Sequence, residues 1–201
     1  YPSRDFVFEN VSAYSREWEH ERLSVQNTVI CGNYDIIVTV PDAIMQYVMP
    51  DEIFNNNCVE LCRGGIVSQS ELCAKLERMG YTRTELVEGV GQFSVRGGIL
   101  DVFTPNYAYP ARIDFFGDEI DLIGLFDTVS QRRIENAENI KLIPCNELIA
   151  TVEARDSIKN NINEMMVNSA KTGLRSIALL MTLLLTKITN HSNIKRFVIA
   201  G

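Results

Sequence analysis

The stretch QFSVRGGILDVF, residues 92–103, carries the clearest fold signal in the sequence. Apolar and polar residues alternate on both sides of Gly97-Gly98, a pattern that predicts two short strands joined by a tight turn. The stretch RIDFFGDEI, residues 112–120, alternates in the same way and contains a second glycine-centred turn. Together these stretches predict an antiparallel sheet of short strands.

Alternation also assigns the side chains of these strands to two faces. Phe93 and Val95 share one face of their strand, and Ile113 and Phe115 share one face of a later strand. The opposite faces carry Gln92, Ser94 and Arg96 on the first strand and Arg112, Asp114 and Phe116 on the later one. If the apolar faces fill the core, Phe116 lies outside beside a guanidinium, which is the composition of an interface hot spot. The alternative is that Phe116 packs under a neighbouring element and that the arginines only pair with Asp114 or Glu119.

The flanking residues extend this αβ module over about residues 55–143. SQSELCAKLERMG, residues 68–80, predicts a helix that opens with Ser68 and Glu71 as a capping box. This helix is expected to bury Leu72, Leu76 and Met79 and to stop at Gly80. Further strands are expected at 58–62, 82–87, 120–126 and 138–143.

The N-terminal residues have a different texture, typical of an α/β fold. Residues 12–30 show helical periodicity, and Arg22 falls outside the apolar side of the expected helix. That apolar side carries Val11, Tyr14, Trp18, Val25 and Val29. DIIVTV, residues 35–40, is a nearly continuous apolar run, as in a strand covered on both faces, and Pro41 begins a short helix.

Beyond Pro144 the sequence turns helical. Helices are expected at about 147–170 and 174–189, followed by a strand-like run at 196–201. The most hydrophobic run, IALLMTLLL at 177–185, is too short to span a bilayer, so we expect a buried helix there and no membrane partner.

Composition bounds the function. An apolar fraction of 46% and a charged fraction of 22% are those of a globular protein. A net charge of −7 argues against tight binding to the DNA backbone by this chain alone. Five irregularly spaced cysteines match no standard zinc spacing and are expected to be reduced, which favours a cytoplasmic protein.

No catalytic motif is evident in the sequence. The sequence contains no G-x-x-x-x-G-K-[ST] phosphate-binding loop, and the glycine-rich stretch GVGQFSVRGG, residues 89–98, lacks the G-x-G-x-x-G spacing, lies between strands and is expected to form hairpin turns. Asp118 and Glu119 follow a glycine between two strands, where acidic residues are ordinary turn formers. His20 is expected to be a solvated helix residue rather than a ligand. We therefore expect no catalytic residue, cofactor site or metal site in this chain.

Three stretches carry a family resemblance. FSVRGGILDVFTP (93–105), RIDFFGDEID (112–121) and FDTVSQRRI (126–134), in this order and spacing, resemble the N-terminal module of bacterial transcription-repair coupling factors. That module is similar to domains of the excision-repair helicase UvrB, but the UvrB-type segment SCIYGLG is absent, which favours the coupling factor. The resemblance covers about residues 1–150 and is weak after residue 155.

The resemblance implies specific site residues and a partner. In this family a small inserted αβ domain docks UvrA, the damage-recognition ATPase of excision repair. The family's contact residues are the arginine of the R-G-G strand, the arginine that opens R-I-[DE]-F-F, and the second phenylalanine of that run. They correspond to Arg96, Arg112 and Phe116, which alternation independently places outward.

The resemblance also implies a domain organisation, α/β in class and α+β overall. Residues 1–54 would be part of a degenerate UvrB-like α/β domain, residues 55–143 the inserted docking domain with its antiparallel sheet, and residues 144–201 a helical return segment. The chain would then be a non-catalytic adaptor fragment that recruits UvrA to lesions where RNA polymerase has stalled. Other parts of the parent protein would contact RNA polymerase and DNA, and its motor domains would use ATP and Mg²⁺.

Two other readings stay open at this point. The chain could be a fragment of UvrB, an ATP-dependent helicase subunit that grips damaged DNA. It could also serve only as an intramolecular brake that packs against other domains of its own chain.

Overall fold

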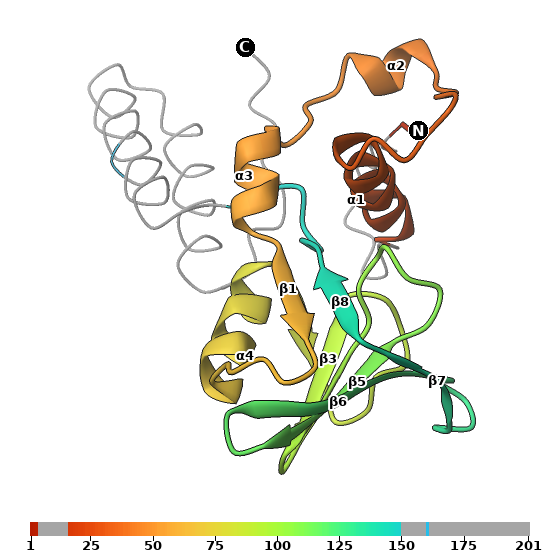
Figure 1. Cartoon of the computed structure of the whole chain (residues 1–201). Coiled ribbons are helices and arrows are strands. Elements are labelled where there is room, and N and C mark those ends of the chain that lie inside the picture. Colours follow the sequence, from red (N-terminus) through yellow and green to blue (C-terminus); the bar gives the residue numbers. More distant parts are fainter. Residues whose placement is uncertain (4–15, 150–159, 161–201) are drawn as a thin grey trace, which may run out of the picture. The chain divides into compact units, whose positions relative to one another are not determined.

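The computed structural model describes residues 1–3, 16–149 and 160, and Tyr1–Glu147 form one compact unit. The helices are α1 (Glu17–Ile30), α2 (Pro41–Ile44), α3 (Asp51–Asn56) and α4 (Gln69–Arg78). The strands are β1 (Val59–Cys62), β2 (Thr82–Arg83), β3 (Gln92–Arg96), β4 (Ile99–Val102), β5 (Ala111–Phe116), β6 (Glu119–Phe126), β7 (Arg133–Ala137) and β8 (Asn139–Leu142). This is an α+β fold of helices and mainly antiparallel strands (Figure 1).

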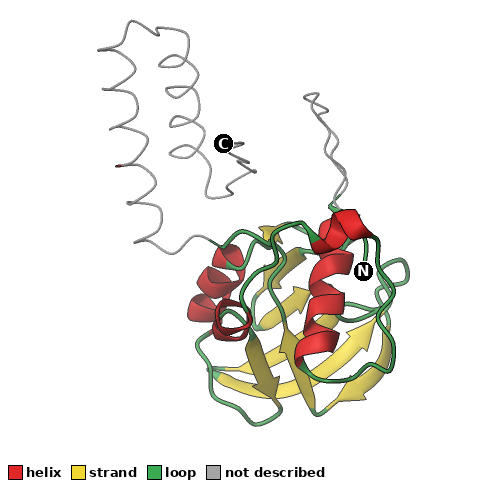
Figure 2. Ribbon diagram, turned by 90° about the horizontal axis from the view of Figure 1, so that it is seen from above, coloured by secondary structure: helices red, strands yellow, loops and turns green. Residues whose placement is uncertain are grey.

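A six-stranded sheet in the order β2-β3-β4-β5-β6-β7 forms the body of the module. Its strands β3 to β6 pair antiparallel in chain order, which confirms the prediction made from alternation and the turn glycines. Phe93 lies opposite Val102 and Leu100 lies opposite Ile113, so these residues share the inner face. Viewed from above, the strands curve behind the helices (Figure 2).

Two strands differ from the prediction. The strand expected at 82–87 is only Thr82–Arg83, and it pairs parallel with β3. The chain bends soon after it, because the backbone N–H groups of Glu88 and Gly89 donate to Oε1 of Gln92 at 2.9 and 3.1 Å. Strand β7 was not expected, because its sequence RIENA shows no apolar alternation. In the structure its residues are mostly exposed.

The core lies between the inner face of the sheet and α4. Leu72, Leu76 and Met79 are buried there, as predicted. Ser68 occupies the N-cap position, but the predicted capping box is wrong: no side chain caps the helix, and the Ser68 hydroxyl pairs with that of Ser70 at 2.9 Å.

A second, two-stranded sheet of β1 and β8 joins the large one through residues 64–67. The N–H of Gly64 donates to the carbonyl of Ile120 at 2.7 Å, and the N–H of Ile120 donates to the carbonyl of Gly65 at 2.8 Å. The N–H of Val67 donates to the carbonyl of Asp118 at 2.8 Å. The first residues of β6 therefore pair with this segment, and the last residues of β6 pair with β7.

Helix α1 confirms the helix expected at 12–30 over its described part, but the predicted buried face is wrong. Trp18 and Val29 are 45% and 37% exposed, and the buried residues are Glu19, Arg22, Leu23 and Gln26. Arg22 Nε lies 2.6 Å from a carboxylate oxygen of Glu147, and Arg22 Nη1 donates to the carbonyl of Pro2 at 2.8 Å. Because α1 is attached through polar groups, apolar periodicity could not identify its inner face.

The strand expected at 35–40 is wrong for the described structure. Residues 35–40 form no strand, and Ile36 and Val38 are 82% and 78% exposed. The N-terminal ammonium group of Tyr1 donates to the carbonyl of Val38 at 2.6 Å, and Thr39 Oγ1 donates to the carbonyl of Tyr1 at 3.0 Å. The helix beginning at Pro41 is confirmed, whereas α3 was not expected.

Several predictions lie outside the described residues. They are the start of the first helix with Val11 and Tyr14, the helices at 147–170 and 174–189 except for residues 147–149 and 160, the run at 177–185 and the strand-like run at 196–201. In the part that is described, no helix is long and apolar enough to cross a membrane.

His20 is not the solvated residue that we predicted. Its Nε2 atom is buried without a hydrogen-bond partner, and its ring packs against Gly91, where an added Cβ would lie 3.1 Å from Nε2. Burial and, to a smaller extent, the nearby Arg16 lower the pKa of His20, Glu19 opposes them, and the resulting pKa is about 4.

This burial predicts acid sensitivity. With a pKa of about 4 in the folded chain and about 6.5 in the unfolded chain, His20 binds more protons when unfolded, so the free energy of unfolding should fall as the pH drops from 6.5 to 4. The substitution His20→Gln should flatten that part of the pH profile, measured by urea denaturation at each pH. Parallel profiles for the two proteins across this window would contradict the assignment.

Candidate protein-docking face

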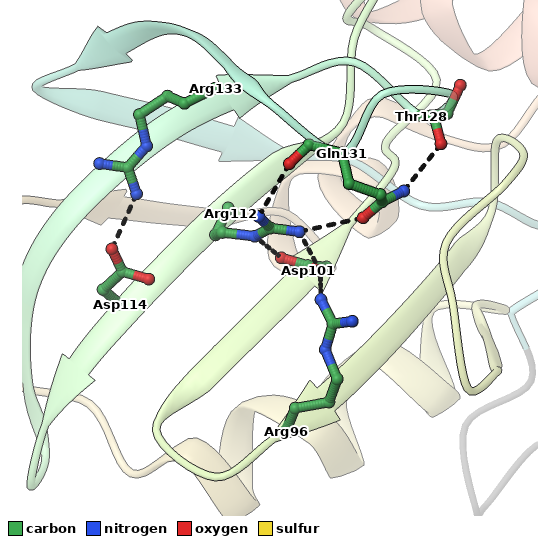
Figure 3. Close-up of polar contacts among 7 residues, drawn as sticks. All are labelled: Arg96, Asp101, Arg112, Asp114, Thr128, Gln131 and Arg133. Atoms are coloured by element: carbon green, nitrogen blue, oxygen red, sulfur yellow. Dashed lines mark hydrogen bonds and ion pairs between the residues drawn. The ribbon is translucent and has the colours of Figure 1, made fainter.

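The outer face of the large sheet is organised around one buried carboxylate, that of Asp101 on β4. Its side chain points away from the apolar core but is only 1% exposed, because two arginines cover it. Arg112 Nε and Nη2 donate to its two oxygens at 2.7 and 2.9 Å, and Arg96 Nη2 donates at 2.6 Å (Figure 3). Both predicted arginines therefore meet at one acid that the sequence analysis had not singled out.

The strand register brings these groups together. Asp101 lies directly opposite Ser94 on β3 and opposite Arg112 on β5. Residues directly opposite each other in antiparallel strands have side chains on the same face, so the ion pair runs across neighbouring strands. On the other side of Arg112 stands Gly124, where an added Cβ would lie 2.7 Å from Nε of Arg133. The missing side chain at Gly124 therefore leaves room for Arg133.

Arg112 is held from several directions. Its Nη1 and Nη2 atoms donate to the backbone and side-chain oxygens of Gln131 at 3.3 and 3.2 Å (Figure 3). Its guanidinium lies over the ring of Phe126 at 4.4 Å. Gln131 has a left-handed φ of 58° and donates from Nε2 to the carbonyl of Thr128 at 2.7 Å. The hydrogen bonds to Asp101 raise the pKa of Arg112 above its usual value, so this side chain is a fixed cation.

Arg96 and Phe116 are the accessible members of the predicted site. The side chain of Arg96 is 46% exposed beside its bond to Asp101. Phe116, the last residue of β5, is 82% exposed and precedes a turn at Gly117 with a φ of 65°. Two steps of alternation along β5 separate Phe116 from Arg112, about 13 Å in an extended strand.

The structure differs from the alternative reading in two respects: Phe116 is exposed, and the arginines pair with Asp101 instead of with Asp114 or Glu119. Asp114 instead bonds Arg133 at 2.8 Å (Figure 3). Asp101, Gln131 and Arg133 were missed, and only for Asp101 did the sequence hold a signal, an acid at an outward position of its strand.

The described residues offer little to metal or thiol chemistry. No group of three His, Cys, Asp or Glu side chains that could hold a metal ion occurs among them. The five cysteines are free, and burial raises the pKa of the thiols of Cys58, Cys73 and Cys145.

The buried acid generates a stability prediction. Asp101→Asn should lower the free energy of unfolding by about 2–3 kcal/mol, since it weakens a desolvated ion pair to two arginines. The matched control is Asp114→Asn, which removes the pair with Arg133, 30% exposed on both sides, and should cost about 0–1 kcal/mol. Urea denaturation of both variants checks this, and equal losses would show that Asp101 does not organise the face.

Comparison with known proteins identifies the module. Residues 59–148 match the UvrB interaction domain family. The transcription-repair-coupling factor of Bacillus subtilis is 30% identical over 171 residues, 85% of this chain and 14% of that protein. The Staphylococcus aureus (strain USA300) protein of the same name is 30% identical over 169 residues, 84% of this chain and 14% of its own length. The Myxococcus xanthus protein is 40% identical over 113 residues, 56% of this chain and 9% of its own length.

The chain therefore spans at most about one seventh of these relatives, and the matches to the Bacillus subtilis and Staphylococcus aureus proteins cover most of the chain. Residues 59–148 belong to the UvrB interaction domain family, within a chain that is related along most of its length to a segment of transcription-repair coupling factors.

Proposed function

We propose that the outer face of the large sheet docks UvrA, with Arg96, Arg112 and Phe116 in the contact. The chain would act as a non-catalytic adaptor that brings UvrA to DNA lesions where RNA polymerase has stalled. The observation that carries the proposal is Phe116, which is 82% exposed in the β5–β6 hairpin, on the sheet face that also carries the hydrogen-bonded Arg96 and Arg112.

The energetics of such a face suit protein recognition. A side chain that is held in place before binding loses little conformational freedom when a partner covers it. Arg112 is held in place by its hydrogen bonds to Asp101 and Gln131. Arg96 is bound at one nitrogen and is exposed over nearly half of its side chain, so it can donate further bonds to carboxylates or carbonyls of a partner.

The arginines have different roles in the proposal. Removal of Arg112 would leave Asp101 with only Arg96 and would disturb the face itself, whereas removal of Arg96 leaves the bidentate pair of Arg112 intact. Phe116 and Arg96 are therefore the residues whose loss reports on binding, and Arg112 is in addition a positioning residue.

The other activities of a coupling factor would lie elsewhere in the parent protein. Contacts with RNA polymerase and DNA, and the use of ATP and Mg²⁺ by motor domains, are assigned to the remaining length of the relatives, of which this chain spans 14%. The net charge of −7 agrees with a chain that does not itself track the DNA backbone.

Binding to purified UvrA tests the proposal by isothermal titration calorimetry. Phe116→Ala should weaken binding by about 2 kcal/mol, roughly thirtyfold, and Arg96→Ala by about 1 kcal/mol, roughly fivefold. The control is Ile36→Ala, which truncates an apolar residue of the same 82% exposure in the segment before α2 and should bind like the wild type.

Thermal unfolding should be nearly unchanged in Phe116→Ala, since that side chain contributes little to the core. If Phe116→Ala and Arg96→Ala bind UvrA as tightly as the control, the docking face is wrongly placed. If the wild type itself does not bind, the adaptor function is wrong for this chain.

A further inference from the structure

A second large apolar side chain is exposed next to Phe116. Ile66, in the segment between β1 and α4, is 84% exposed. Ile66 pairs with Glu119 across an isolated antiparallel bridge, and Phe116 pairs with the same Glu119 across the β5–β6 hairpin. Glu119 therefore stands between two apolar residues that are 50 positions apart in the sequence.

These three side chains lie on one face. Partners directly opposite each other in antiparallel strands share a face and have Cβ atoms about 5 Å apart, so Ile66, Glu119 and Phe116 form a row about 10 Å long. A single exposed apolar residue is ordinary on a protein surface. Here two such residues, each more than 80% exposed, lie on either side of one carboxylate and form a small apolar surface with an acid at its centre.

Backbone hydrogen bonds fix this row. The N–H of Gly64 donates to Ile120 at 2.7 Å and the N–H of Val67 donates to Asp118 at 2.8 Å, so bonds flank Ile66 on both sides. The N–H of Phe115 donates to the carbonyl of Gly98 at 2.7 Å, which holds the end of β5. The side chains are thus presented from a rigid frame, and their burial by a partner would order little further backbone.

The charge of the row indicates what would cover it. Asp118 and Glu119 are both exposed at this tip, and neither appears in an ion pair among the described residues. A carboxylate enclosed between two apolar side chains would be desolvated on binding, and this is favourable only if the partner brings a cation to it.

We propose that Ile66, Glu119 and Phe116 form a single recognition row that receives an apolar segment of UvrA together with a lysine or arginine that pairs with Glu119. The inference rests on the docking function proposed above and extends it from one aromatic residue to a three-residue row. The surface of UvrA that meets the row would then carry apolar side chains next to a basic group.

Calorimetric titration of this chain with UvrA tests the row. Ile66→Ala should weaken binding about fivefold to tenfold, as expected for truncation of a contact beside a hot spot. Glu119→Gln keeps the shape, should weaken binding about fivefold, and should change the dependence of the affinity on salt concentration, because an ion pair is lost. Ile36→Ala is a matched control, the same residue type at 82% rather than 84% exposure outside the row.

The double variant Ile66→Ala/Phe116→Ala distinguishes one row from two independent contacts. If both side chains enter the same apolar segment of UvrA, their losses should not add, and the double variant should differ from the product of the single effects by at least twofold to threefold. Thermal unfolding of every variant should match the wild type, since all three side chains are exposed.

The outcomes separate this inference from the docking function. If Phe116→Ala weakens binding but Ile66→Ala behaves like Ile36→Ala, the row is wrong while the docking function stands. If Glu119→Gln leaves the affinity and its salt dependence unchanged, the basic group on the partner is wrong. If none of the variants changes binding, the docking face itself is wrong and the row with it.

Discussion

The outer face of this module depends on one interaction, the pairing of the Asp101 carboxylate with two guanidinium groups. Burial of a carboxylate that is only 1% exposed is costly unless its charge is paired, and Arg112 and Arg96 supply three hydrogen bonds to it. Because the carboxylate must be covered, the two arginines that cover it are held in fixed positions on the sheet. Gln131 and Phe126 then fix the remaining freedom of Arg112.

This constraint separates the residues of the face into two kinds. Arg112 belongs to the frame, and a partner would meet it as an already ordered surface. Phe116 lies at the end of the same strand, beyond the ion pairs, and is free to enter a partner. Residues 59–148, which match the UvrB interaction domain family, contain the whole of this face.

Sequence reasoning succeeded where one physical rule decides the local structure. Alternation and turn glycines predicted β3 to β6, and the same alternation placed the side chain of Phe116 in solvent.

Sequence reasoning failed where contacts with a second element decide the structure. Asp101 could not be identified as the partner of both arginines, because that pairing depends on strand register, which follows from the completed sheet. The inner face of α1 carries Glu19, Arg22 and Gln26 beside Leu23, and Arg22 pairs with Glu147, far along the chain, so apolar periodicity selected the wrong side. The exposed position of Ile66 beside Glu119 was missed for the same reason, since Glu119 lies in another strand.

The pairing of β1 with β8 has a consequence for how such a module can be used in a larger protein. Val59 lies directly opposite Leu142, so the chain enters and leaves the module at adjacent points. A domain whose two ends meet in this way can be spliced into a loop of a host domain without forcing the host apart, because the gap to be bridged is about one strand spacing. The same closure ties both ends of the module into one short sheet, so a pull on the flanking chain would be opposed first by the β1–β8 hydrogen bonds and would reach the docking face last.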